Sequence, residues 1–148
     1  MRALIQRVSS ASVAIDGQEI SRIRTGLMIL LGAGSNDDET TCAKLWNKVK
    51  KLRIFPDAQG KTNLDLAAVG GSVLIVSQFT LFANCRKGNR PSFIEAADPE
   101  TGNRLYELFV SLAKKDVDDV QTGEFGASME VTLTNSGPFT IWLDTDEF

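Results

Sequence analysis

The sequence predicts an α+β fold in which two amphipathic helices pack on a mostly antiparallel, barrel-like sheet. Three observations favour this class. Apolar and polar residues alternate with the period of strands near both ends of the chain, a central stretch is apolar on both faces, and only two segments show helical spacing. The length of 148 residues fits a single domain, residues 1–148, that can bury a core without disulfides.

The first third of the chain predicts a β-meander. Strands over residues 3–8 and 11–15 lead to Asp16-Gly17, a pair typical of two-residue hairpin turns, and a strand over residues 19–23 returns from it. The segment Gly26–Gly32 is a continuous apolar run between glycines. Such a run predicts a central strand that is covered on both faces.

Two segments have the spacing of amphipathic helices. The first helix is expected from Asn36 to Leu52, with Asn36 and Glu39 as a capping box. Its apolar stripe consists of Cys42, Leu45, Trp46, Val49 and Leu52. The second helix is expected to begin at Asp98, with Pro99 in the first helical position and lysines near its C-terminal end. We expect it to cover one face of the sheet.

A strand expected over Ser72–Phe82 changes character near its end. Both of its faces are apolar until Ser77, and polar side chains follow. Ser77, Gln78 and Thr80 must therefore find hydrogen-bond partners at the end of an otherwise buried strand. Either cross-strand backbone groups satisfy them, or they belong to a binding site.

A Gly-Pro pair interrupts the pattern of the last strand. Residues 127–134 alternate, residues 139–143 read as strand again, and Gly137-Pro138 lies between them. Proline cannot donate to a ladder and glycine weakens a strand. Two interpretations are open: the pair forms a bulge or turn, or it presents bare backbone to a ligand, with Pro138 able to hold the preceding peptide bond cis.

The absence of histidine excludes more chemistry than any motif does. The chain has no residues for a Ser-His-Asp triad, a Cys-His pair or a His-ligated metal centre. Its two cysteines, Cys42 and Cys85, lack zinc spacing, and Cys42 fits a small core residue. We therefore expect neither a metal site nor a cofactor.

The charge balance limits the partners that the protein can bind. A net charge of −3 and a pI near 5.0 argue against a protein that grips long nucleic acid through many phosphates. Two basic segments could still make a short RNA contact: a cluster over residues 44–53 and a turn-rich loop over residues 84–93. The alternative for the first segment is a solvated helix face. Without a long apolar run or a signal-peptide core, we expect a cytoplasmic protein with no membrane association.

Four segments together resemble the D-aminoacyl-tRNA deacylase family, and the resemblance covers the whole chain. They are Met1–Val8, Ser77–Leu81 (Ser-Gln-Phe-Thr-Leu), Lys87–Phe93 and Asn135–Thr140 (Asn-Ser-Gly-Pro-Phe-Thr). The resemblance implies hydrolysis of the ester between a D-amino acid, or achiral glycine, and the 3′-terminal adenosine of tRNA, including glycyl-tRNA mischarged on tRNA-Ala. It also implies a homodimer in which the Ser-Gln-Phe-Thr strand of one subunit meets a Gly-cisPro motif inserted from the other.

The resemblance gives the Gly-Pro pair a purpose. The carbonyl oxygens of Gly137 and Pro138 would occupy the space that an L side chain needs, whereas glycine, which has no side chain, would pass. Arg7 lies in an apolar setting, so it either extends to the rim of the protein or holds a backbone carbonyl. The resemblance implies that Arg7 pins the Gly137-Pro138 main chain.

Further substrate contacts follow from the resemblance. Phe125 and Met129 are either core residues or a platform for a nucleobase, and the resemblance implies that they flank the terminal adenine. The remaining candidate substrate-binding residues are Ser77, Gln78, Phe79 and Thr80.

Three hypotheses about catalysis remain open at this point. Thr80 carries the hydroxyl that a covalent mechanism would use, but no histidine or lysine in its motif can activate it. Alternatively, backbone N–H groups around Phe79 and Thr80 stabilise an oxyanion, Gln78 orients the substrate, and the terminal ribose hydroxyl of the tRNA helps to activate water. The third hypothesis is a non-catalytic module that binds RNA 3′ ends or nucleotides.

Overall fold

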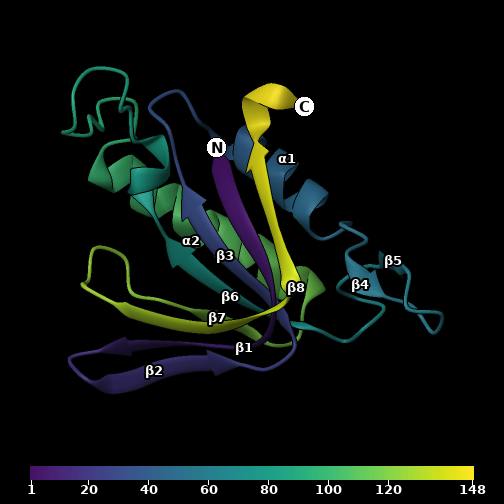
Figure 1. The fold of residues 1–148 in the computed structure, drawn as a ribbon. Helices are drawn as coiled ribbons and strands as arrows, with labels where there is room; N and C mark the ends of the chain where they lie inside the picture. Colours follow the sequence, from purple (N-terminus) through teal and green to yellow (C-terminus); the bar gives the residue numbers. More distant parts are fainter.

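The computed structural model describes residues 1–148 as a six-stranded sheet, two helices and a small two-stranded sheet (Figure 1). The strands of the main sheet are β1 (Arg2–Ile15), β2 (Gln18–Ile23), β3 (Gly26–Gly32), β6 (Ser72–Ser77), β7 (Val120–Thr122) and β8 (Glu130–Asp144). β8 pairs along nearly the full length of β1, whose other edge is shared by β2 and β3. The small sheet consists of β4 (Phe55–Pro56) and β5 (Thr62–Leu64).

The pairing directions confirm the predicted fold class. β1 is antiparallel to β2, β3 and β8, and only the pairs β3–β6 and β6–β7 are parallel. The hairpin at Asp16-Gly17 is also confirmed, with φ of 51° and 77° at the two residues. A type I′ turn requires positive φ at both positions, which is why this pair favours it.

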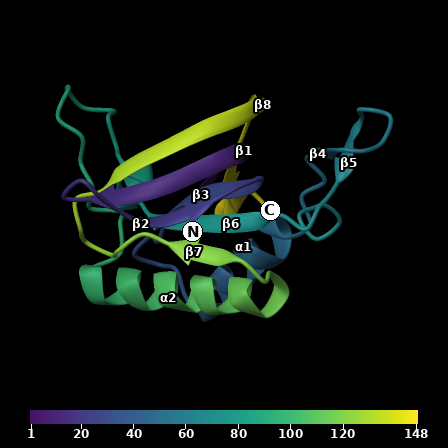
Figure 2. The same cartoon turned by 90° about the horizontal axis from the view of Figure 1, so that it is seen from below.

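The helices α1 (Glu39–Val49) and α2 (Pro99–Asp116) lie on the same side of the sheet (Figure 2). They contact each other through Trp46 and Phe109, whose rings meet edge to face with centroids 5.4 Å apart. A core of 20 buried residues fills the space between the helices and the sheet. The second helix begins as predicted, since Asp98 is the N-cap and Pro99 the first helical residue.

A second, smaller core lies on the opposite side of the central strands. In β6, Val73 and Ile75 belong to the core under the helices, whereas Leu74 and Val76 belong to a cluster of seven residues shared with β1, β2 and β3. β3 lies between β1 and β6 in the sheet. The prediction of a central strand covered on both faces is therefore confirmed.

The predicted boundaries of the first helix are wrong. The N-cap is Asp38, not Asn36, because the Asp38 carboxylate accepts a hydrogen bond from the Thr41 N–H at 2.8 Å. This bond also holds the pKa of Asp38 below its usual value. At the other end the helix stops at Val49 rather than at Leu52.

The strand predicted over Ser72–Phe82 is also too long. β6 ends at Ser77, and Phe79–Phe82 form a short 3-10 helix, η1, whose first turn closes through a 3.2 Å bond from the Leu81 N–H to the Gln78 carbonyl. The segment Ser-Gln-Phe-Thr is therefore the end of a strand followed by a tight turn. Its polar groups lie at the edge of the core.

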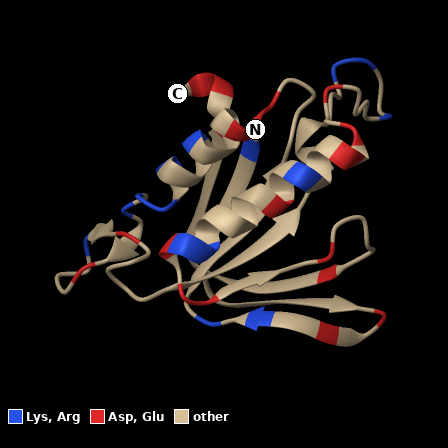
Figure 3. Cartoon of the chain, turned by 180° about the vertical axis from the view of Figure 1, so that it is seen from behind, with Lys and Arg blue, Asp and Glu red and all other residues tan.

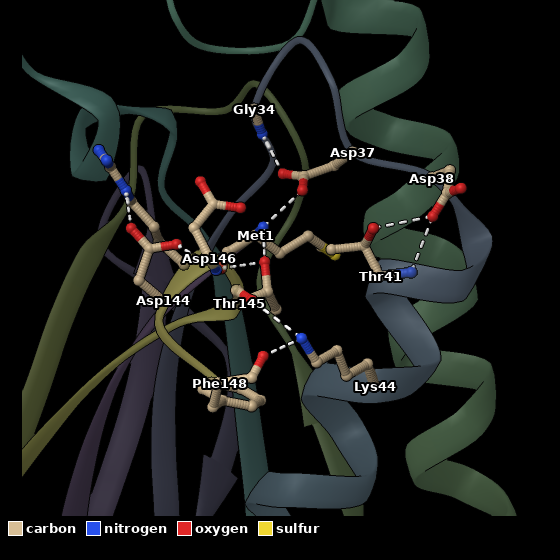
Figure 4. A network of polar contacts seen from close by, with 11 residues as sticks. Met1, Gly34, Asp37, Asp38, Thr41, Lys44, Asp144, Thr145, Asp146 and Phe148 are labelled. Atoms are coloured by element: carbon tan, nitrogen blue, oxygen red, sulfur yellow. Dashed lines mark hydrogen bonds and ion pairs between the residues drawn. The ribbon is translucent and has the colours of Figure 1, made fainter.

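The acidic C-terminus packs against the N-terminus (Figure 4). Thr145 is buried, its N–H donates to the Met1 carbonyl at 2.9 Å, and its hydroxyl oxygen lies 2.5 Å from the Met1 nitrogen. Asp37 accepts a second bond from the Met1 nitrogen at 2.5 Å.

Neither helix has the length and apolar content needed to cross a membrane.

Candidate functional site

A cavity of about 630 Å³ lies between the end of β6, the first turns of α2 and the segment that leads into β8. Five of the residues singled out from the sequence line it: Ser77, Gln78, Phe79, Phe125 and Met129. The wall is mostly apolar, with 13 hydrophobic residues among its 19. A few polar groups in an apolar cavity of this size are typical of a small-molecule or nucleotide site.

The Ser-Gln-Phe-Thr segment reaches the cavity because β6 stops at its edge. The Gln78 N–H still pairs with the Leu31 carbonyl of β3 at 2.7 Å, and the chain then turns into η1. The N–H groups of Phe79 and Thr80 open this turn, where backbone donors have no partner within the turn itself. The Gln78 side-chain amide donates to the Thr80 hydroxyl oxygen.

The contact with Gln78 determines what the Thr80 hydroxyl can do. Its oxygen accepts the amide proton, so its own proton is free to be donated to another group. The chain contains no histidine, and the Thr80 side chain contacts no lysine or carboxylate that could remove the proton. Thr80 is thus placed as a hydrogen-bond donor without an adjacent base.

Aromatic side chains form two sides of the cavity. Phe79 is 57% exposed and packs edge to face on Phe93, with ring centroids 5.1 Å apart. On the other side Phe125 lies 6.0 Å from the ring of Tyr106, whose hydroxyl donates to the Ile75 carbonyl of β6 at 2.9 Å. Burial raises the pKa of Tyr106 to about 12, so this donor stays protonated at neutral pH.

Met129 lies beside this aromatic wall because Gly123 makes room for it. A Cβ on Gly123 would stand 2.6 Å from the Met129 sulfur. The sulfur also accepts a hydrogen bond from the Glu124 N–H at 3.4 Å. Phe125 and Met129, which the sequence left open as core or platform residues, are therefore at the surface of the cavity.

A second group of predicted residues lies on β8 and β1, away from the cavity wall. The Gly137-Pro138 peptide bond is cis, and both residues are exposed. Arg7 holds this segment from β1: its Nε donates to the Ser136 carbonyl at 2.8 Å, and its guanidinium lies 4.7 Å from the centroid of the Phe139 ring. The carbonyl that Arg7 holds is thus the one immediately before Gly137.

Arg7 also ties the segment to a distant loop and leaves no room for a side chain at Gly137. Its Nη1 donates to the Ile54 carbonyl at 2.6 Å. A Cβ on Gly137, where φ is +143°, would lie 2.9 Å from Arg7 Nη2 and 3.1 Å from the Phe139 nitrogen. Glycine is required here by both the backbone conformation and the space.

Sequence reasoning gave no role to Asn135 and Gln6, which shape the same segment. The Asn135 amide donates to the Gln6 side chain at 3.0 Å and to the Phe139 carbonyl at 3.2 Å, and its oxygen accepts from the Phe139 N–H at 2.5 Å. The pairing of β1 with β8 shifts register opposite this point. The sequence did carry a signal for this contact. Asn135 lies four residues before Phe139, and an asparagine side chain bonds readily to nearby main-chain groups.

The predicted site residues therefore form two groups in one chain. Arg7, Gly137 and Pro138 do not line the cavity that Ser77, Gln78, Phe79, Phe125 and Met129 share, and Thr80 lies at its edge through Gln78.

Neither Cys42 nor a cluster of acidic residues offers an alternative reaction centre. Cys42 is fully buried, and burial raises the pKa of its thiol to about 12, so it does not form a thiolate near neutral pH. No group of three His, Cys, Asp or Glu side chains converges as a metal site.

Comparison with known proteins agrees with these features. The model of a family described as D-Tyr-tRNA(Tyr) deacylase matches residues 4–144. Proteins named D-aminoacyl-tRNA deacylase from Thermosipho melanesiensis and Thermomicrobium roseum are 51% and 52% identical, over 98% and 99% of this chain and 97% and 96% of their own.

Two solved structures have a similar fold. A c-Myc DNA Unwinding Element Binding Protein superposes with a TM-score of 0.93 at 36% identity, covering 97% of this chain and 98% of its own. A probable eukaryotic D-amino acid tRNA deacylase superposes with a TM-score of 0.85 over 96% of this chain and 97% of its own, and at 16% identity this likeness shows the fold alone. The matched length and the identity to curated relatives show that the chain belongs to the D-Tyr-tRNA(Tyr) deacylase family.

Proposed function

We propose that this protein is a hydrolase that cleaves the ester between a D-amino acid, or glycine, and the 3′-terminal adenosine of tRNA. The observation that carries the proposal is the cavity at which the end of β6 meets Phe125 and Met129. Relatives about half identical over nearly the whole chain are named for this activity. The reaction belongs in the cytoplasm, where tRNAs are charged.

The cavity can hold an aminoacylated adenosine. Its volume of about 630 Å³ lies within the range of small-ligand sites. In the proposed complex the adenine lies between Phe125 and Met129, an arrangement in which an aromatic ring and a polarizable thioether contact the faces of the base. The ester then reaches Ser77, Gln78 and Phe79, which line the same cavity.

Catalysis in this proposal depends on position and on backbone donors. In this proposal the N–H groups of Phe79 and Thr80 face the ester carbonyl and stabilise the oxyanion that forms on it, which contributes about 3–4 kcal/mol per donor. Gln78 orients the Thr80 hydroxyl, which donates its proton to the substrate. With no base beside Thr80, the attacking group is water. The 2′-hydroxyl of the terminal ribose accepts a proton from this water and passes its own proton to the 3′-oxygen, which leaves as the ester C–O bond breaks.

The Gly137-Pro138 segment supplies the stereochemical filter. It is exposed and lies off the cavity of its own chain, so we propose that it enters the cavity of a second subunit in a homodimer. Arg7 and Asn135 hold its main chain from both sides, which suits an exclusion surface that must not yield. The exposed ring of Phe79 is the type of surface that a second subunit would cover.

The proposed filter also predicts which esters pass. An L side chain would clash with the carbonyl oxygens of Gly137 and Pro138, whereas a D side chain points away from them. Glycine has no side chain to clash, so glycyl-tRNA, including glycine mischarged on tRNA-Ala, is expected to be hydrolysed.

The test is incubation of the purified protein with D-tyrosyl-tRNA and with L-tyrosyl-tRNA, followed by measurement of the free amino acid. The proposal expects rapid release of D-tyrosine and persistence of the L ester. A non-catalytic nucleic-acid-binding module would leave both esters intact, and this alternative has support because one solved relative is named for DNA binding. Cleavage of both esters at the same rate would refute the filter.

A further inference from the structure

A basic loop, defined here as residues 85–91 (Cys-Arg-Lys-Gly-Asn-Arg-Pro), projects beyond the end of the sheet (Figure 1). We propose that this loop binds the backbone phosphates of the tRNA strand that lead to the terminal adenosine. The inference rests on the proposed function, because it extends the substrate contact from the cavity to the RNA outside it.

The charge of the basic loop differs from that of the rest of the chain. Arg86, Lys87 and Arg90 lie within seven residues that contain no acid. Since the protein has 16 basic and 19 acidic side chains, the remainder has 13 against 19. Figure 3 shows the basic positions at the exposed tip of this loop. On a protein of net negative charge, a loop that carries only cations can attract a polyanion to that place.

The three cations are unpaired. The side chains of Arg86, Lys87 and Arg90 are exposed and take part in none of the ion pairs or side-chain hydrogen bonds of the structure. By contrast, Arg2 and Lys50 pair with Asp144 and Asp116. The charges of the basic loop are therefore free for a ligand.

The base of the basic loop is fixed at the rim of the cavity. Asn84 and Ser92 exchange two backbone hydrogen bonds of 2.8 and 3.0 Å, and the Asn84 side chain accepts from the Arg86 N–H at 3.1 Å. The next residue, Phe93, lines the cavity and contacts Phe79. The cations are thus attached directly to a wall of the proposed ester site.

The chemistry of the substrate identifies the groups that the loop would meet. An aminoacylated adenosine seated in the cavity carries no negative charge on its ester or its base. The first anions are the phosphates on the 5′ side of that nucleoside, just outside the cavity. Arginine and lysine are the side chains that bind such phosphates.

The test compares tRNA with a substrate that lacks the phosphates. The variant Arg86→Gln/Lys87→Gln/Arg90→Gln removes the three charges from the loop. Its matched control, Arg24→Gln/Lys61→Gln/Lys114→Gln, removes three exposed charges that lie outside both basic clusters and form no ion pair. For both variants kcat/KM is measured on D-tyrosyl-tRNA and on D-tyrosyl-adenosine, together with the Kd for uncharged tRNA at several salt concentrations.

The loop variant is expected to lose roughly tenfold in kcat/KM on D-tyrosyl-tRNA and in affinity for uncharged tRNA. The slope of log Kd against log salt should fall by about 2, because each phosphate contact on a single strand contributes about 0.7. Hydrolysis of D-tyrosyl-adenosine should not change. The control variant should lose much less on tRNA, and all variants should keep the wild-type Tm.

Several results would overturn the inference. They are an unchanged Kd and salt slope in the loop variant, an equal loss in the control, or an equal loss on D-tyrosyl-adenosine. Failure of the proposed function is a separate result, since a wild-type protein that cleaves neither ester would still reveal the role of the loop through its binding of uncharged tRNA.

Discussion

Replacing Arg7 with alanine is expected to loosen the Gly137-Pro138 segment from the rest of the fold. The Arg7 guanidinium donates to the carbonyls of Ser136 and Ile54 at 2.8 and 2.6 Å and lies over the Phe139 ring. A hydrogen bond from a charged group contributes about 1.5–3 kcal/mol, and an exposed cation–π contact about 0.5–1 kcal/mol. Because Arg7 is only half-buried and water can replace part of these contacts, we expect the free energy of unfolding to fall by about 2 kcal/mol.

Urea unfolding measures this loss, and the ratio of kcat/KM for D-tyrosyl-tRNA over L-tyrosyl-tRNA measures its effect on the filter. A mobile segment should exclude L side chains less well, so the ratio should fall roughly tenfold, which corresponds to about 1.4 kcal/mol. The control is Arg22→Ala, which breaks an exposed ion pair with Glu19 and should change stability by less than about 1 kcal/mol. If Arg7→Ala is as stable as this control and discriminates like the wild type, the reasoning is wrong.

Three further predictions concern the ester, the threonine and the buried tyrosine. D-Tyrosyl-tRNA ending in 2′-deoxyadenosine, with the ester on the 3′-oxygen, should be hydrolysed at least about a hundredfold more slowly in single-turnover assays, because the proposed general base is missing; an unchanged rate would exclude substrate assistance. Thr80→Ala should lower kcat about tenfold, because a neutral hydrogen bond outside the oxyanion site contributes about 1 kcal/mol. A loss of several orders of magnitude with the fold intact would favour a covalent role. Tyr106 is the only tyrosine of the chain. Its pKa is raised from 10.0 to about 12 in the folded protein, so the tyrosine of the unfolded protein loses its proton first as the pH rises above 10. The free energy of unfolding should therefore fall by on the order of 2 kcal/mol between pH 10 and 12. Ultraviolet titration of the tyrosine measures the pKa, and the variant Tyr106→Phe should lack this pH dependence of stability.

Elements set by local chemistry were predictable from the sequence. Asp16-Gly17 forms its hairpin because both residues tolerate positive φ, and Asp98-Pro99 starts α2 because a cap and a fixed φ act within one turn. The central strand Gly26–Gly32 was likewise evident from its continuous apolar run.

Boundaries that depend on competing local patterns were not predictable. Phe79 and Leu81 fit the alternation of a strand, and they fit the 3-10 helix that they form equally well. The bond from the Leu81 N–H to the Gln78 carbonyl ends the strand and begins the 3-10 helix. Asn36 and Asp38 are both good N-caps, and only the bond from the Thr41 N–H selects Asp38.

Contacts between distant parts of the chain do not follow from local sequence patterns. The bonds from Arg7 to Ser136 and Ile54, and the meeting of Phe125 with the end of β6, exist only once the sheet has formed. The family resemblance implied that Arg7 holds the Gly137-Pro138 main chain and that this motif lies apart from the Ser-Gln-Phe-Thr segment of its own chain, whereas local patterns alone gave neither.

The most direct test of the proposed site is a crystal structure with D-tyrosine joined through an amide to 3′-amino-3′-deoxyadenosine. The adenine should lie between Phe125 and Met129, the amide carbonyl should face the N–H groups of Phe79 and Thr80, and Gly137-Pro138 of a second chain should face the Cα of the tyrosine. Adenine bound outside this cavity, or a cavity with no second chain over the ligand, would contradict the proposal.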